Sequence, residues 1–168
     1  KLLKVGTDTE LFLRDKKTGL PVSVEGLLGG TKHRPREVLG GNGFAVQEDN
    51  VMAEFNVPPA SNADEFSNNI GRMLNYLKNE EFGPKGLDLL AAPSMEFSRE
   101  QLNSRQAGMF GCEPDYCAWT LEENEVANSP ELEHLRTCGG HLHVSFTVDG
   151  RNPSLEDMLL IVKTLDIF

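Results

Sequence analysis

Two acidic side chains stand in the middle of segments that have the alternating pattern of β-strands. Glu10 lies within residues 5–13, and Glu54 lies within residues 51–57. Because side chains alternate across a strand, Glu10 shares a face with Asp8, and Glu54 lies opposite an apolar face. Acidic residues are disfavoured in strands unless they face water or have a task. An exposed sheet face explains either residue alone, but the same feature in two strands favours a binding or catalytic role.

A third candidate group follows a pair of glycines late in the chain. Residues 138–148 indicate a strand on which His141, His143 and Ser145 share one face. The two glycines that precede His141 allow a ligand or another backbone to approach closely. Paired imidazoles on a strand can ligate one metal ion, or one can ligate while the other contacts substrate. A single histidine is more often structural, but this spacing after two glycines favours a site.

These residue types fit three kinds of metal site. Several carboxylates with one imidazole suit magnesium or manganese, because hard cations prefer oxygen ligands. A zinc hydrolase would instead use His141, His143 and a carboxylate and would leave one position open for water. A structural zinc site is a third interpretation, with ligands from Cys112, Cys117, Cys138 and His141. The chain has neither a Gly-x4-Gly-Lys-Ser/Thr phosphate loop nor a Gly-x-Ser-x-Gly nucleophile motif.

A basic loop stands out in this acidic chain. Residues 29–36 contain two glycines followed by Lys32, His33, Arg34 and Arg36. Such a segment is either a solvated loop or a lid that folds over a site and brings cations to phosphate groups. In the second case Lys32 is the first candidate, because the glycines before it provide a hinge.

The elements that must position these residues indicate an α+β fold. Strands are predicted at residues 5–13, 20–24, 43–48, 51–57, 87–92 and 138–148. Helices are predicted to begin after Asn62, Ser98 and Ser154, each of which has a second capping side chain three residues later. The first and last helices have an apolar stripe, and residues 103–136 are expected to be rich in loops. Antiparallel hairpins with interspersed helices are typical of the α+β class.

The properties of the whole chain fit one domain over residues 1–168. The formal net charge of −10 argues against nucleic acid as a partner, because proteins that bind it carry a basic face. No run of about 18 apolar residues is present, so no membrane span is predicted. Three cysteines cannot all pair with one another, which favours a reducing cytoplasm over a disulfide framework. The last predicted helix reaches Phe168 without a cap signal, and we expect further residues in the natural gene product.

Four motifs stand out along the chain: GTDTELFL at residues 6–13, QEDNVMAEFN with PPA at 47–60, FGCEPDY at 110–116 and GGHLHV at 139–144. These motifs resemble, in the same order, those of the phage-type COOH·NH2 ligases (amidoligases) of the glutamine synthetase-like superfamily. The resemblance implies a curved, mainly antiparallel sheet with helices on one face, whose concave face holds ATP, divalent metal ions and a carboxylate. It also implies that the carboxylate takes the γ-phosphate of ATP, and that an amine then displaces phosphate to leave an amide.

The resemblance and the patterns above assign roles to individual residues. The expected metal ligands for Mg2+ or Mn2+ are Glu10, Glu54 and His141, with Glu48 as an additional ligand. The residues expected to contact ATP are His143, Ser145 and Lys32. The candidate catalytic residues are Lys32, Glu48 and Arg136.

Two departures from the family pattern shape the remaining expectations. The first strand has a single glutamate, Glu10, where glutamine synthetases often have a closely spaced pair, so Asp8 is a candidate for the second role. The family's later strands, which bear arginine and glutamate, have no counterpart before Phe168. We therefore expect the chain to be incomplete as an enzyme and to associate with a C-terminal segment or as a homo-oligomer.

The implied substrates are a carboxylate and an amine, on a small molecule, a peptide or a protein end. The implied location is the cytoplasm, or the host cytoplasm for a phage-encoded protein. Two alternatives stay open. One is a zinc-dependent amide hydrolase that uses His141 and His143, and the other is a catalytically silent binding or structural relative.

Overall fold

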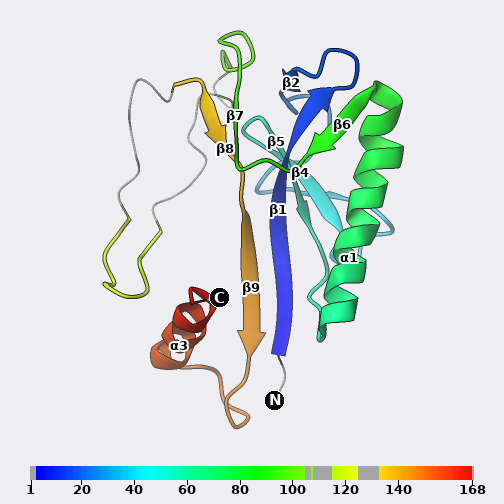
Figure 1. Cartoon of the computed structure of the whole chain (residues 1–168). Coiled ribbons are helices and arrows are strands. Elements are labelled where there is room, and N and C mark those ends of the chain that lie inside the picture. Colours follow the sequence, from blue (N-terminus) through cyan, green and yellow to red (C-terminus); the bar gives the residue numbers. More distant parts are fainter. Residues whose placement is uncertain (1–2, 105–106, 108–114, 125–132, 168) are drawn as a thin grey trace.

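The computed structural model describes residues 3–104, 107, 115–124 and 133–167. Its centre is a curved antiparallel sheet of seven strands arranged around the long strand β1 (Figure 1). The strands of this sheet are β1 (Leu3–Asp15), β2 (Pro21–Val22), β3 (Arg36–Glu37), β4 (Ala45–Asp49), β5 (Met52–Asn56), β6 (Leu87–Leu90) and β9 (Gly140–Phe146). The first part of β1 pairs with β9, its middle pairs with β5, and its end pairs with β2 and β6. The structure confirms the predicted mixture of helices and strands and the predicted curved, mainly antiparallel sheet.

Two tight turns connect the strands that were expected to form hairpins. After β1, the carboxylate of Asp15 accepts hydrogen bonds from the backbone N–H groups of Lys17 and Thr18, which fixes the turn into β2. Between β4 and β5, Asn50 adopts a positive φ of 57°, a left-handed conformation that asparagine tolerates well. Both predicted hairpins are confirmed.

Helix α1 (Ala63–Tyr76) packs against one face of the sheet. It begins where predicted, because the side chain of Asn62 accepts a hydrogen bond from the backbone N–H of Glu65. The helix continues into a π-helical turn (Leu77–Phe82) and a 3-10 turn (Gly83–Lys85). The main core lies between these helical segments and the sheet, with fully buried members Leu13, Val24, Val46, Ala53, Phe55, Met73, Leu77 and Phe82.

A smaller apolar cluster covers the other face of the sheet at the end of β1. Phe12 and Phe97 lie at its centre, with their ring centroids 5.7 Å apart. Beside it, β7 (Ser94–Glu96) and β8 (Leu135–Thr137) form a separate two-stranded sheet that was not predicted. The helix predicted after Ser98 is wrong, because residues 99–102 form only a turn.

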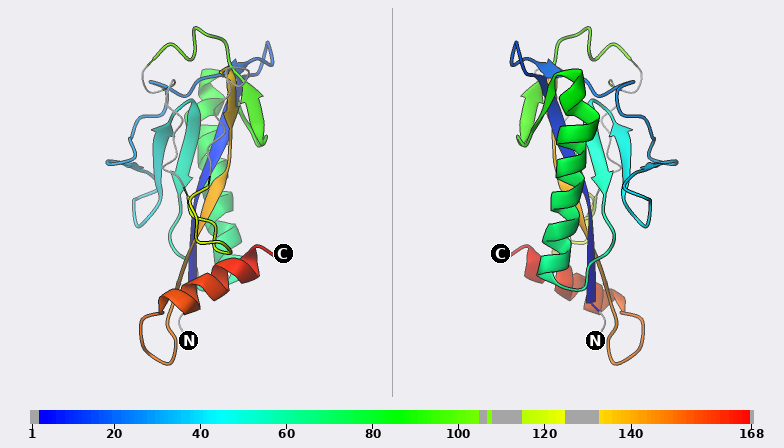
Figure 2. Two further views of the ribbon diagram at one scale, coloured as in Figure 1. Left: turned by 90° about the vertical axis from the view of Figure 1, so that its left-hand side faces the viewer. Right: turned by 90° about the vertical axis from the view of Figure 1, so that its right-hand side faces the viewer.

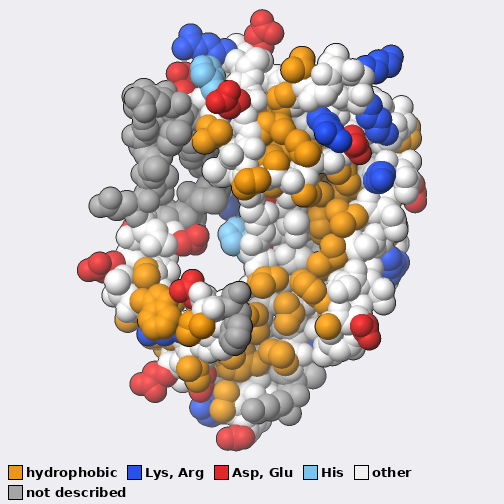
Figure 3. Space-filling view, in the orientation of Figure 1, with side chains coloured by type: hydrophobic (Ala, Val, Ile, Leu, Met, Phe, Trp, Pro, Cys, Tyr) orange, Lys and Arg blue, Asp and Glu red, His pale blue; other side chains and the backbone are white. Residues whose placement is uncertain are grey.

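Helix α3 (Leu155–Leu165) begins at a complete capping box between Ser154 and Asp157, which confirms the predicted start. The expectation that the helices share one face of the sheet is wrong, because α1 and α3 lie on opposite sides of it (Figures 1 and 2). No residue of α3 is buried, and its apolar side chains face a groove of about 540 Å³ beside β1 and β9. Figure 3 shows hydrophobic side chains over α3 and over the sheet next to it. Within the described residues, neither helix has the length and apolar character needed to cross a membrane.

Candidate metal centre

Three carboxyl groups from three neighbouring strands converge on the face of the sheet opposite α1. Glu10 of β1 lies directly across from Glu54 of β5, and Asp49 is the last residue of β4. One oxygen from each side chain can be chosen so that all three lie within 4.8 Å of one another. In the described part of the chain, no other three His, Cys, Asp or Glu side chains meet this condition. We call Glu10, Asp49 and Glu54 the acidic cluster.

The acidic cluster is electrostatically strained. Glu54 is 8 % exposed, and burial, followed by the charges of Asp49, Asp8 and Glu10, raises its pKa to about 7. A hydrogen bond of 2.7 Å from the side-chain amide of Gln47 opposes this increase but does not cancel it. Burial is also the main cause of the raised pKa values of Glu10 and Asp49. Carboxylates this close disfavour one another's ionised form, so the cluster suits a ligand with positive charge.

The chemistry of the cluster fits a hard divalent cation. It offers carboxylate oxygens, which Mg2+, Mn2+ and Ca2+ prefer, from side chains that two hydrogen-bonded strand pairs hold in place. Oxygens of Asp49 and Glu10 lie within 4.8 Å of each other, so the two groups repel when both are ionised. A divalent ion bound between them would offset this repulsion.

The two predicted histidines lie next to the acidic cluster and share a carboxylate. Oδ1 of Asp8 is 3.2 Å from Nδ1 of His141, and Oδ2 of Asp8 is 3.1 Å from Nε2 of His143. The charge of protonated His141 acts to lower the pKa of both Glu10 and Asp49, which places this ring close to the cluster. The structure therefore places Glu10 and Glu54 in one cluster, with His141 near it but outside the group whose ligand atoms lie within 4.8 Å of one another.

The basic loop brings Lys32 to the same region. The ammonium group of Lys32 partly offsets the effect of burial on the pKa of Asp49. The loop lies directly on β4: Gly30 has a φ of +80°, and a Cβ atom there would be 2.4 Å from the carbonyl oxygen of Val46. Such tight packing favours a fixed loop over a hinge at the two glycines.

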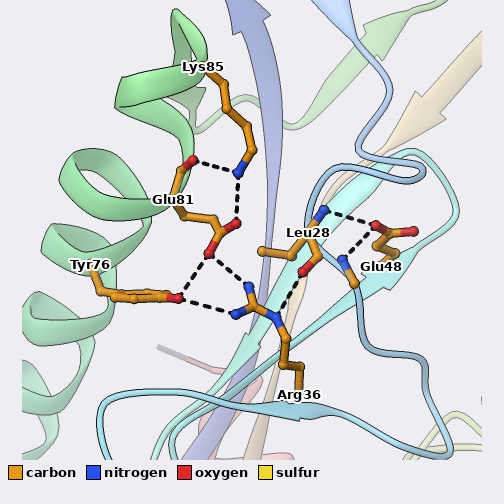
Figure 4. Close-up of polar contacts among 7 residues, drawn as sticks. Leu28, Arg36, Glu48, Tyr76, Glu81 and Lys85 are labelled. Carbon is orange, nitrogen blue, oxygen red and sulfur yellow. Dashed lines mark hydrogen bonds and ion pairs between the residues drawn. The ribbon is translucent and has the colours of Figure 1, made fainter.

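Arg36 anchors the end of this loop to the helical side of the molecule. Its guanidinium donates hydrogen bonds to the carbonyl oxygen of Leu28 at 2.9 Å and to the carboxylate of Glu81 at 2.8 Å (Figure 4). Glu81 also accepts hydrogen bonds from the hydroxyl of Tyr76 and from the ammonium of Lys85. Arg36 thus ties the segment that carries Lys32 to α1 and the turn that follows it.

Glu48 does not belong to the acidic cluster, and its assignment as a metal ligand and catalytic residue is corrected. In the register of β4 and β5, Gln47 lies across from Glu54, and Glu48 lies across from Ala53 on the opposite face. Its carboxylate accepts hydrogen bonds from the backbone N–H groups of Gly26, Leu28 and Gly29, at 2.7 to 3.0 Å. Figure 4 shows the bond from Leu28. Glu48 therefore fixes the backbone of the loop that precedes Lys32.

Arg136 is also corrected from a catalytic to a structural position. It is 5 % exposed, and its guanidinium donates hydrogen bonds to the carbonyl oxygens of Ala107, Glu133 and Leu135.

Ser145 is exposed on the same strand face as His143 and lines the groove beside α3. It lies further along β9 than His143, where β9 pairs with the first residues of β1.

Among the described residues, Cys117, Cys138 and His141 do not form a converging group of zinc ligands. The thiol of Cys138 donates to the carbonyl oxygen of Glu10 at 3.0 Å, and burial raises its pKa to about 11. Cys112 and most of the motif at 110–116 lie outside the described residues.

Asp49 is the member of the cluster that sequence reasoning misses. The Asp49-Asn50 pair suggests only a turn, whereas alternation along β4 places Asp49 on the same face as Gln47.

In comparisons with known proteins, no family model, no curated protein and no solved structure matches this chain. The features that bear on function are the geometry of the acidic cluster and the four sequence motifs.

Proposed function

We propose that this chain forms the metal- and nucleotide-binding centre of an ATP- and magnesium-dependent carboxylate–amine ligase. The observation that supports this most strongly is the convergence of Glu10, Asp49 and Glu54 on the face of a curved antiparallel sheet, with His141 beside them. Carboxylate oxygens with one imidazole suit magnesium or manganese. The resemblance of four motifs to amidoligases supplies the type of reaction.

In the proposed reaction, an oxygen of the substrate carboxylate attacks the γ-phosphorus of ATP. The bond to ADP breaks, and an acyl phosphate forms. The amine nitrogen then attacks the acyl carbon, inorganic phosphate leaves, and loss of a proton from nitrogen gives the amide. When bound, the divalent ion supplies positive charge that stabilises the phosphate oxygens during transfer.

The residues of the chain have distinct tasks in this proposal. Glu10, Asp49 and Glu54 would hold the ion, and His141, whose charge acts on Glu10 and Asp49, would complete its ligands. Lys32 places a second positive charge near the cluster, on a loop that Glu48 and Arg36 fix in advance. A charge held in place before the reaction stabilises a transition state without reorganisation of the protein. His143 and Ser145 face the same side of the sheet and would contact ATP or the carboxylate.

The geometry favours the ligase over the zinc hydrolase. In the hydrolase, His141 and His143 must direct one nitrogen each to a single ion. In this structure each ring directs a nitrogen to Asp8, and the described residues contain no converging ligand group that includes both rings.

Titration calorimetry tests the proposal. The chain should bind Mg·ATP, and Glu54→Gln should lose this binding because it lacks one ligand charge of the cluster. Glu25→Gln is the matched control, since it makes the same chemical change at an exposed position. Binding of zinc but not of Mg·ATP would support the hydrolase. Binding of neither would support a catalytically silent relative.

A further inference from the structure

Asp8 contacts both imidazoles of β9, and it does so through different oxygens and different ring nitrogens. Its Oδ1 faces Nδ1 of His141 at 3.2 Å, and its Oδ2 faces Nε2 of His143 at 3.1 Å. Oδ1 also accepts a hydrogen bond from the backbone N–H of His141 at 3.1 Å. The side chain of Asp8 is 19 % exposed and lies across from His141 in the pairing of β1 with β9. The carboxylate is thus held between the two rings.

This geometry favours one proton position on each ring. The Nε2–H of His143 can donate a hydrogen bond to Asp8, whereas Nδ1 of His141 lies at ion-pair distance from it. An ionised carboxylate can only accept hydrogen bonds and repels a nitrogen lone pair at this distance, so an N–H group is favoured on each ring nitrogen that faces Asp8. A neutral His141 then has its proton on Nδ1 and its lone pair on Nε2. A neutral His143 has its proton on Nε2 and its lone pair on Nδ1. One carboxylate therefore selects opposite tautomers in two neighbouring histidines.

We propose that Asp8 is a positioning residue that locks His141 and His143 in opposite tautomers, so that Nε2 of His141 is the nitrogen available to a cation at the acidic cluster. A carboxylate that accepts the second N–H of a metal-bound histidine fixes the ring and increases its basicity. Asp8 then acts through His141 and is not itself a metal ligand. The role of the cation rests on the proposed function, but the tautomers do not.

The tautomers can be read without any metal or nucleotide. Long-range 1H–15N NMR of the chain labelled at histidine, in EDTA at about pH 8.5, reads the tautomer of each ring from the shifts of its two nitrogens. Single His141→Gln and His143→Gln variants assign the signals. We expect the Nδ1–H tautomer for His141 and the Nε2–H tautomer for His143. The exposed His33 provides an internal reference for an imidazole in water.

Asp8→Asn is the decisive variant. An amide offers one accepting oxygen and one donating NH2 group, so it cannot accept from both rings, and at least one histidine must change tautomer. Asp149→Asn removes the same charge at an exposed turn residue with a φ of 50°, which asparagine tolerates, and should change neither ring. The proposal is overturned if both rings of the parent have the Nε2–H form, or if Asp8→Asn leaves both tautomers unchanged.

Binding of Mn2+ alone, followed by EPR, separates this inference from the proposed function. Asp8→Asn should weaken Mn2+ binding about 10- to 100-fold, the range for residues that orient a metal ligand. A nitrogen coupling to bound Mn2+ should disappear in His141→Gln and persist in His143→Gln. If the tautomers are as expected but the parent binds no Mn2+, the proposed function fails and the role of Asp8 stands. If Mn2+ binds but the tautomers are not as expected, only the role of Asp8 fails.

Discussion

Replacing Glu54 with glutamine should make the metal-free chain more stable at neutral and alkaline pH. The pKa of Glu54 in the folded chain is about 7, above its ordinary value of 4.5. The folded state therefore holds this proton more tightly than the unfolded state does. Stability that is fully present below pH 4.5 is lost as the pH rises through 7. Glutamine has the shape of the protonated side chain and does not ionise, so the variant avoids this loss.

The size of the effect follows from the pKa difference. One pKa unit corresponds to about 1.4 kcal/mol, so ionisation of Glu54 destabilises the fold by about 3 kcal/mol above pH 7. The hydrogen bond from Gln47 is kept, because the substituted amide retains an accepting oxygen. Divalent ions offset this difference. An ion that binds only the folded parent adds about 2.7 kcal/mol at about 100 times its Kd, which nearly cancels the difference, and about 4.1 kcal/mol at about 1,000 times its Kd, which reverses the order of stability; the variant gains little.

Urea denaturation of both chains in EDTA, at several pH values from about 4.5 to 8, measures this directly. The free energy of unfolding of Glu54→Gln minus that of the parent should increase with pH and approach about 3 kcal/mol. Glu25→Gln should show no such trend, because Glu25 is exposed. The reasoning is refuted if Glu54→Gln is no more stable than the parent at pH 8 without metal ions.

Three further variants test the loop that carries Lys32. Gly30→Ala should destabilise the fold by about 1–3 kcal/mol in urea titrations, and more than Gly19→Ala, because both positions have positive φ but only Gly30 meets the backbone of β4. Glu48→Ala should speed proteolytic cleavage within residues 26–36, because three backbone N–H groups lose their acceptor; an unchanged cleavage rate would contradict this. Lys32→Ala should raise the pKa of Asp49 further in a carboxyl 13C titration, since Lys32 opposes the effect of burial there.

Local sequence patterns were sufficient to predict the elements that form the site. Alternation placed Asp8 and Glu10 on one face of β1, and the pairing of β1 with β9 puts His141 across from Asp8. The cap signals at Asn62 and Ser154 gave the correct helix starts, because a side-chain acceptor for a free N–H is a local requirement.

The same kind of signal at Ser98 gave a false helix. There the Ser98 oxygen does accept from the backbone N–H of Gln101, but the side chain of Gln101 bonds to the distant carbonyl oxygen of Pro21 and the turn ends.

Long-range contacts explain most of the remaining errors. Strands β7 and β8 pair residues about 40 positions apart, and no local pattern specifies that pairing. Arg136 looks like a catalytic cation in the sequence, but its donors bond to carbonyl oxygens of residues such as Ala107 that are distant along the chain.

The error at Glu48 has a different cause, because alternation along β4 already places Glu48 on the opposite face from Gln47 and Asp49. The family resemblance grouped Glu48 with the ligands, and the strand geometry removes it.

The central claim is that Glu10, Asp49 and Glu54 together bind a hard divalent cation. The most direct test is Mn2+ titration, followed by EPR, of the parent, Glu10→Gln, Asp49→Asn and Glu48→Gln. The account predicts that the first two variants lose more than about 100-fold in affinity, whereas Glu48→Gln, on the opposite face of β4, binds as the parent does. A parent that binds no Mn2+, or an Asp49→Asn variant that binds it as tightly as the parent, would contradict the account.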